Sequence, residues 1–144
     1  MNRRVLFIDE DQARNGSTVS MEYLVRGFKE QGYEVFVLTW KIDPRFKAPL
    51  ATMATLIDGR FSVVTTITLC VHFTYSASPF SPRGLLSLAK DVVKFFVGMA
   101  IVMKTIRATR PELVYVNEYS VVQASVAASL LGVPAVMHIR SPML

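Results

Sequence analysis

Residues 5–39 have the sequence VLFIDEDQARNGSTVSMEYLVRGFKEQGYEVFVLT and predict a β-α-β unit. The unit opens with the continuous apolar run 5–8, which is typical of a parallel strand buried on both faces. After a polar loop, apolar residues recur at helical spacing at Met21, Leu24, Val25 and Phe28. Gly32 is a natural residue to end that helix, and residues 34–39 are β-branched and apolar enough for a second strand. A helix between the two strands lets them run parallel, and such crossovers are nearly always right-handed. The unit therefore starts a parallel sheet.

The rest of the chain continues the alternation of strands and helices. Further strands are predicted for residues 63–69, 113–116 and 135–139, and further helices for residues 82–109 and 121–131. The long helix should stop at Arg110, because the residue before a proline avoids the α region. Residues 41–60 contain two prolines and indicate an irregular or partly helical segment. The whole pattern predicts an α/β fold, a Rossmann-like doubly wound parallel sheet, as one domain over residues 1–144.

Composition and charge exclude several classes of protein. The chain is 51% apolar and 19% charged, which excludes a disordered protein. Cys70 is the sole cysteine, so no intramolecular disulfide can form and a reducing, cytoplasmic location is expected. The apolar run 5–8 is shorter than the roughly 7 to 15 residues of a signal-peptide core. The net charge of +5 could attract phosphates or anionic lipid, and without a reader motif we expect no nucleic-acid partner.

The predicted topology places a candidate binding site at one edge of the sheet. Ligands of open parallel sheets bind beyond the carboxyl ends of the strands, where the strand order reverses. If the order is Rossmann-like, the reversal lies between the strands at 5–8 and 113–116, and the first helix presents free backbone N–H groups there. The predicted substrate-binding residues come from three segments of the chain and are Asn15, Gly16, Ser17, Asn117, Glu118, His138 and Arg140.

Each of these segments also has a purely structural interpretation. Gly16 and Ser17 are common in turns and helix caps, and Asn117 and Glu118 could be solvated residues after a strand. His138 lies between apolar neighbours and could be a hydrogen-bonded core histidine. Arg140, two residues on and therefore on the same face, is the stronger candidate for binding phosphate.

Familiar catalytic motifs are missing from the sequence. It contains no Gly-x-Ser-x-Gly, no metal-binding histidine pair, no phosphate-binding loop ending in Gly-Lys-Ser/Thr, and no Gly-x-Gly-x-x-Gly after the first strand. We therefore assign no catalytic residue, no metal and no cofactor. A flavodoxin-like domain is also disfavoured, because the first loop lacks a Ser/Thr-rich phosphate cradle.

Three blocks of sequence resemble the retaining GT-B glycosyltransferases of the large family-four type. These blocks are Gly32-Tyr33-Glu34-Val35, residues 110–117 (RPELVYVN) and residues 130–136 (LLGVPAV). They are similar to that family's Gly-His-Glu-Val, Arg-Pro-Asp-Val-Val-His-Val-His and Gly-Ile-Pro-Val-Val, and they occur in the same order. The chain departs from the pattern at Ser17, where members often have a second glycine, and at Arg140, where they often have histidine.

This resemblance implies one half of a two-domain, metal-independent enzyme of carbohydrate or polysaccharide biosynthesis. The chain would be the N-terminal domain that holds a sugar or lipid-linked acceptor. A C-terminal domain, absent from this chain, would bind the nucleotide-sugar, which is a substrate and not a cofactor. Cleavage of the sugar-phosphate bond needs cations on the leaving diphosphate, and the resemblance places most of them in that second domain. The isolated chain is therefore expected to be inactive as a hexosyltransferase.

Residues 95–103 (FFVGMAIVM) form an uncharged stretch within the predicted long helix. Nine residues span about 13 Å of helix, too short for a bilayer core of roughly 30 Å. Two interpretations remain open: a buried crossover helix, or a helix lying peripherally on the inner membrane face through Phe95 and Phe96. An alternative to the enzyme is a non-catalytic Rossmann-like subunit that recruits a separate catalytic half, which requires an exposed apolar patch.

Overall fold

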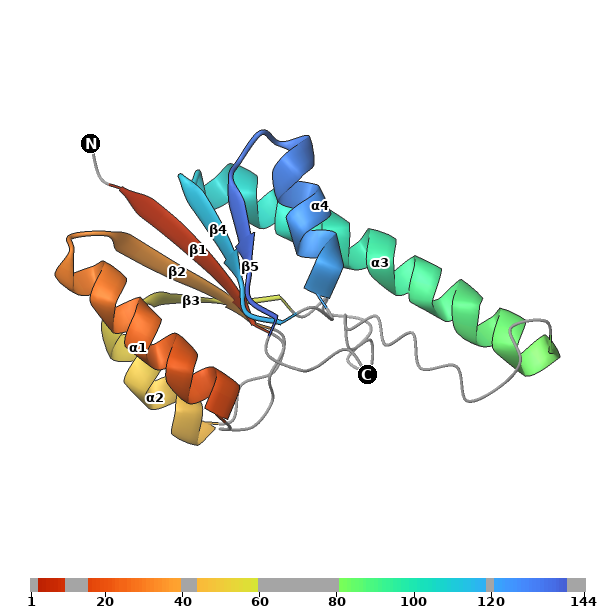
Figure 1. Cartoon of the computed structure of the whole chain (residues 1–144), viewed down its shortest axis with the longest axis horizontal. Coiled ribbons are helices and arrows are strands. Elements are labelled where there is room, and N and C mark those ends of the chain that lie inside the picture. Colours follow the sequence, from red (N-terminus) through yellow and green to blue (C-terminus); the bar gives the residue numbers. More distant parts are fainter. Residues whose placement is uncertain (1–2, 10–15, 40–43, 60–80, 119–120, 140–144) are drawn as a thin grey trace.

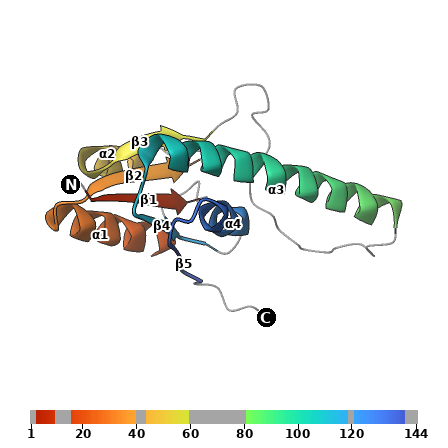
Figure 2. The ribbon, with the colours of Figure 1, turned by 90° about the horizontal axis from the view of Figure 1, so that it is seen from above.

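The computed structural model describes residues 3–9, 16–39, 44–59, 81–118 and 121–139. They form a parallel sheet of five strands, in the order β3-β2-β1-β4-β5, with helices on both faces (Figures 1 and 2). The strands are β1 (Arg4–Asp9), β2 (Glu34–Thr39), β3 (Thr55–Asp58), β4 (Leu113–Val116) and β5 (Ala135–Met137). The helices are α1 (Gly16–Glu30), α2 (Pro44–Met53), α3 (Pro82–Thr109) and α4 (Val122–Leu130). The predicted Rossmann-like parallel sheet is confirmed.

The largest differences from the prediction are at β5 and β3. β5 was expected to reach residue 139 and ends at Met137. β3, at Thr55–Asp58, was not predicted, because this edge strand has only four residues and none of them is fully buried. It follows α2, which is the helical part of the segment expected to be irregular. The strand predicted for residues 63–69 lies outside the described residues.

Two hydrophobic cores lie on opposite faces of the sheet. Successive residues of a strand point to opposite sides, so Val5 and Phe7 face α1 and α2 while Leu6 and Ile8 face α3 and α4. All four side chains are fully buried. This two-sided burial is the reason that β1 is a continuous apolar run without alternation.

Two glycines end helices α1 and α4 in the same way. Gly32 and Gly132 have φ angles of +84° and +67°, which residues with a Cβ rarely adopt. After α1, the N–H of Gly32 donates to Lys29 O and that of Tyr33 donates to Phe28 O, the Schellman pattern. The rings of Phe28 and Tyr33 also meet edge to face at 5.0 Å, which adds the apolar contact of this motif.

Helix α3 ends at Thr109 as predicted, but Arg110 adopts an unexpected conformation. Its φ and ψ of 49° and 57° lie in the left-handed region, whereas a residue before a proline usually has an extended backbone. The Arg110 N–H donates to Ile106 O at 2.8 Å and so satisfies one carbonyl of the last helical turn. This hydrogen bond holds an arginine where glycine is usually found.

Replacing Arg110 with glycine should therefore stabilise the domain by up to about 1 kcal/mol, because glycine adopts the left-handed region without steric cost. Thermal unfolding would show this as a higher Tm. Arg107→Gly is the matched control, since Arg107 is exposed in the right-handed part of the same helix. That control should cost about 1 kcal/mol. A loss of stability in Arg110→Gly would contradict this explanation.

The two halves of α3 have different surroundings. Its C-terminal half packs on the sheet and α4 through the buried residues Gly98, Val102, Thr105, Ile106 and Thr109. Its N-terminal half projects beyond the sheet (Figure 1), and Gly84 is the buried residue there. The buried-crossover interpretation therefore holds only for the C-terminal half. In the described part of the chain, no helix combines the length and apolarity needed to cross a membrane.

Candidate functional site

The strand order reverses between β1 and β4, as the sequence predicted. β2 and β3 continue the sheet on one side of β1, and β4 and β5 continue it on the other. Asp9 is the last residue of β1, and Asn117 and Glu118 follow β4 directly. The carboxyl ends of the strands therefore gather these residues, the N-terminus of α1 at Gly16 and His138 after β5 at one edge, which we call the carboxyl edge (Figures 1 and 2).

A buried hydrogen bond joins β1 to β4 at this edge. Asn117 Nδ2 donates to Asp9 Oδ1 at 3.1 Å, and the Asn117 backbone N–H donates to Ile8 O at 3.0 Å. Asp9 is 1% exposed and Asn117 is 0% exposed. The interpretation of Asn117 as a solvated residue is therefore wrong. Its amide positions the edge by holding together two strand ends that are 108 residues apart in the chain.

Asp9 was not among the residues predicted from the sequence. It carries the same signal as Asn117, a polar side chain at the end of a fully buried strand. Buried polar groups nearly always have hydrogen-bond partners, and that rule pointed to some partner for Asp9 without naming it.

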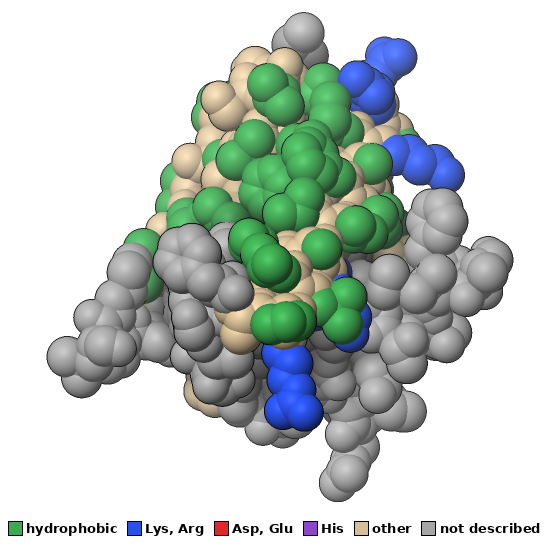
Figure 3. Space-filling view, turned by 90° about the vertical axis from the view of Figure 1, so that its right-hand side faces the viewer, with side chains coloured by type: hydrophobic (Ala, Val, Ile, Leu, Met, Phe, Trp, Pro, Cys, Tyr) green, Lys and Arg blue, Asp and Glu red, His purple; other side chains and the backbone are tan. Residues whose placement is uncertain are grey.

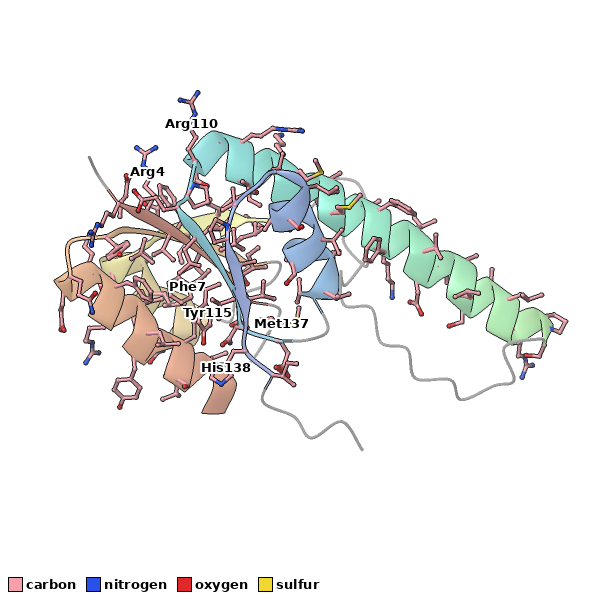
Figure 4. The ribbon with its side chains drawn as sticks, turned by 45° about the horizontal axis from the view of Figure 1, so that its top comes forward. Arg4, Phe7, Arg110, Tyr115, Met137 and His138 are labelled. Carbon is pink, nitrogen blue, oxygen red and sulfur yellow. The ribbon has the colours of Figure 1, made fainter. Side chains whose placement is uncertain are left out.

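His138 is partly buried and hydrogen-bonded. Its Nδ1 lies 2.7 Å from the Tyr115 hydroxyl, with the donor set by the tautomer, and its backbone N–H donates to Val116 O at 2.8 Å. Tyr115 in turn lies against Phe7, with ring centroids 5.1 Å apart. Figure 4 shows Phe7, Tyr115 and His138 following one another along the sheet toward its carboxyl edge. The structure thus provides the partner that the structural interpretation of His138 required, while the residue as a whole stays partly exposed.

The remaining predicted residues are placed in part. Gly16 is exposed at the start of α1, with nothing within 4 Å of the position that a Cβ would take. Glu118 is partly buried at the same edge. Ser17 is described only as a residue of α1, and Asn15 and Arg140 lie outside the described residues. The structure brings Gly16, Asn117, Glu118 and His138 to one edge.

The described strand ends carry acidic charge at the carboxyl edge. β1 and β3 end in Asp9 and Asp58, and Glu118 follows β4; none of the described residues that end or directly follow a strand here is a lysine or arginine. Basic side chains lie at the opposite edge, where Arg4 Nε is 2.8 Å from Glu34 Oε2 (Figure 4). Carboxylates accept hydrogen bonds from hydroxyl groups and repel phosphates. Within the described residues, no cluster of three or more His, Cys, Asp or Glu could hold a metal ion.

The fold is shared with glycosyltransferases of known structure. SnogD from Streptomyces nogalater matches with a TM-score of 0.57 and 18% identity over 96% of this chain. CalG4, the calicheamicin glycosyltransferase, matches with a TM-score of 0.59 and 16% identity over 94% of this chain. The match takes in only 33% and 32% of those two proteins, so this chain spans about a third of each. This chain has the fold of their Rossmann-like GT-B domain.

Proteins of another kind share the same fold. The C-terminal domain of a hydrogenase from Pyrococcus furiosus matches with a TM-score of 0.56 and 16% identity, over 96% of this chain and 94% of that domain. No model of a known protein family matches the sequence, and neither does any curated protein. At these identities the likeness establishes the fold, and the choice of function depends on the chemistry of the carboxyl edge.

Proposed function

We propose that this domain is the acceptor-side half of a GT-B glycosyltransferase, of the family-four, retaining type that its sequence resembles. It would bind the sugar or lipid-linked acceptor, while a second domain holds the nucleotide-sugar and no metal is required. The observation that carries the proposal is the carboxyl edge, where the strand order reverses in a fold that glycosyltransferases share.

The acidic residues at the described strand ends favour an acceptor over a donor. Carboxylates such as Glu118 and Asp58 are suited to the hydroxyl groups of a sugar, which donate hydrogen bonds to them. A nucleotide diphosphate is bound for transfer by clustered cations together with helix N-termini, and none of the described residues that end or directly follow a strand here is a lysine or arginine. The buried Asp9–Asn117 pair would position this edge without touching the acceptor.

The proposal can be tested by NMR titration of the 144-residue chain. The probes are methyl glycosides of glucose, galactose, mannose and N-acetylglucosamine, and separately UDP-glucose and GDP-mannose. One or more of the glycosides should shift backbone amides near Gly16, Glu118 and His138. The nucleotide-sugars should be neither bound tightly nor turned over by this chain alone.

Two glutamates on either side of β4 provide a matched pair of variants. Glu118 follows the carboxyl end of β4, and Glu112 precedes its amino end and is exposed. Glu118→Gln should weaken glycoside binding by about tenfold, because a hydrogen bond to a charged group contributes roughly 1.5 kcal/mol or more. Glu112→Gln should leave the affinity unchanged. Equal effects of the two variants, or glycoside shifts confined to another surface, would refute the acceptor site.

One observation favours the second candidate, a non-catalytic recruiting subunit. That function requires an exposed apolar patch, and the N-terminal half of α3 carries one. The two candidates differ in the titration above, because a recruiting subunit has no reason to bind glycosides at the carboxyl edge.

A further inference from the structure

The N-terminal half of α3 exposes an unusually dense group of large apolar side chains. Six of them between residues 85 and 96 are 37% to 58% exposed, namely Leu85, Leu86, Leu88, Val92, Val93 and Phe96. We call this group the α3 apolar face. Figure 3 looks onto this end of the molecule and shows hydrophobic side chains gathered across it, with basic side chains around them. Contiguous apolar surface of this kind marks an interaction site.

The spacing of these residues makes them one continuous stripe. Leu85, Leu88, Val92 and Phe96 are three, four and four residues apart, and such positions share one side of a helix. Leu86 and Val93 lie next to that row. The stripe runs for about 17 Å along the helix. The helix is fixed in place beyond Phe96, because the C-terminal half of α3 is packed against α4 and the sheet.

Phe95 and Phe96, the pair expected to contact a membrane, are placed differently. Phe95 is partly buried, whereas Phe96 is 57% exposed and meets the Phe95 ring edge to face at 5.6 Å. The exposed surface therefore extends from Phe96 toward the start of α3, and the uncharged run at 95–103 contributes little to it.

Basic residues accompany the apolar stripe. Arg83 and Lys90 are both exposed and seven residues apart, so they share a side of the helix that is distinct from the stripe. Over the whole of α3 there are five basic residues and one acidic residue, Asp91, which lies 3.7 Å from Lys94. A partner for this surface must therefore accept both apolar side chains and a net positive charge.

We propose that the α3 apolar face docks on an anionic membrane surface, with the helix lying in the headgroup region. Helices that lie on membranes combine an apolar side with a lysine- and arginine-bearing side, whereas protein interfaces are depleted in lysine. The apolar stripe would enter the acyl boundary while Arg83 and Lys90 contact lipid phosphates. The docking does not depend on sugar transfer.

Vesicle flotation of the 144-residue chain tests this docking. We expect flotation with vesicles of phosphatidylcholine containing about one third phosphatidylglycerol, and weaker flotation with phosphatidylcholine alone or at high salt. The triple variant Leu85→Ser/Val92→Ser/Phe96→Ser should bind the anionic vesicles at least about tenfold more weakly. A matched control, Tyr23→Ser/Leu130→Ser/Val136→Ser, changes three exposed apolar residues elsewhere and should bind as the unchanged protein does.

A second variant separates charge from apolar contact. Arg83→Gln/Lys90→Gln removes no apolar residue, and each substitution should weaken binding to anionic vesicles by about fivefold. Circular dichroism and Tm show whether each variant is folded. If the triple variant does not fold, the loss of binding in the charge variant tests the docking by itself. No flotation with anionic vesicles, or equal binding by the triple variant and its control, would overturn the proposal. Self-association that the triple variant abolishes, without vesicle binding, would instead make this face a contact between copies.

Discussion

Replacing Phe7 with alanine is expected to lower the free energy of unfolding by about 4 kcal/mol. Phe7 is fully buried in β1, the central strand of the sheet. Its ring meets Phe28 edge to face at 5.6 Å and lies 5.1 Å from Tyr115. Alanine would leave a cavity between α1 and the sheet, because a close-packed interior relaxes only in part.

The effect should extend to the carboxyl edge. Tyr115 rests on Phe7 and holds His138 through its hydroxyl, so the NMR signals of His138 should shift in the variant. Urea denaturation measures the stability. Tyr23→Ala, an exposed aromatic residue on α1, is the control and should change it by less than about 0.5 kcal/mol. If Phe7→Ala does not fold, Phe7→Leu should still cost about 1 kcal/mol or more. A Phe7→Ala variant as stable as its control would contradict the described core.

Asn117→Asp should cost about 3 kcal/mol at neutral pH. The substitution replaces the donor that faces Asp9 by a second carboxylate, in a place where both residues are almost fully buried. Two like charges at hydrogen-bond distance in a dry site repel strongly. Asn117→Ala removes the same hydrogen bond without adding a charge, so its cost should be smaller, about 2 kcal/mol.

The pH dependence distinguishes repulsion from simple loss of the hydrogen bond. In the folded Asn117→Asp variant the two carboxylates favour taking up a proton, more than they do in the unfolded chain. The deficit relative to the unchanged protein should therefore shrink as the pH falls from about 7.5 to 5. Denaturation curves at both pH values measure this deficit. The control is Gln31→Glu, which also replaces an amide by a carboxylate but at an exposed site. A deficit that does not change with pH would argue against two facing carboxylates.

Local signals explain why much of the fold could be predicted. The strands β1, β2 and β4 are buried, and such strands appear in a sequence as short apolar runs. Gly32 and Gly132 end helices with positive φ angles. Glycine adopts such angles easily because it has no Cβ, and this is a property of the residue itself. These features depend on a few neighbouring residues, so the sequence by itself is enough to reveal them.

β3 and the partner of Asp9 could not be predicted, because both depend on residues that are far apart in the chain. Thr55–Asp58 is a strand because it pairs with β2 at the edge of the sheet, and its own residues give little indication. Asn117 was expected at the correct edge, but its burial and its hydrogen bond to Asp9 come from a residue 108 positions away. Such pairings depend on distant parts of the chain meeting in space.

Helix α3 shows the same division within a single element. Its bounds, its apolar residues and its basic residues are local properties, and the sequence alone established them. Which apolar residues are covered depends on where α4 and the sheet lie, and they cover only the C-terminal half. Periodicity identifies a face that avoids water, but only tertiary packing decides whether the domain itself or another surface buries that face.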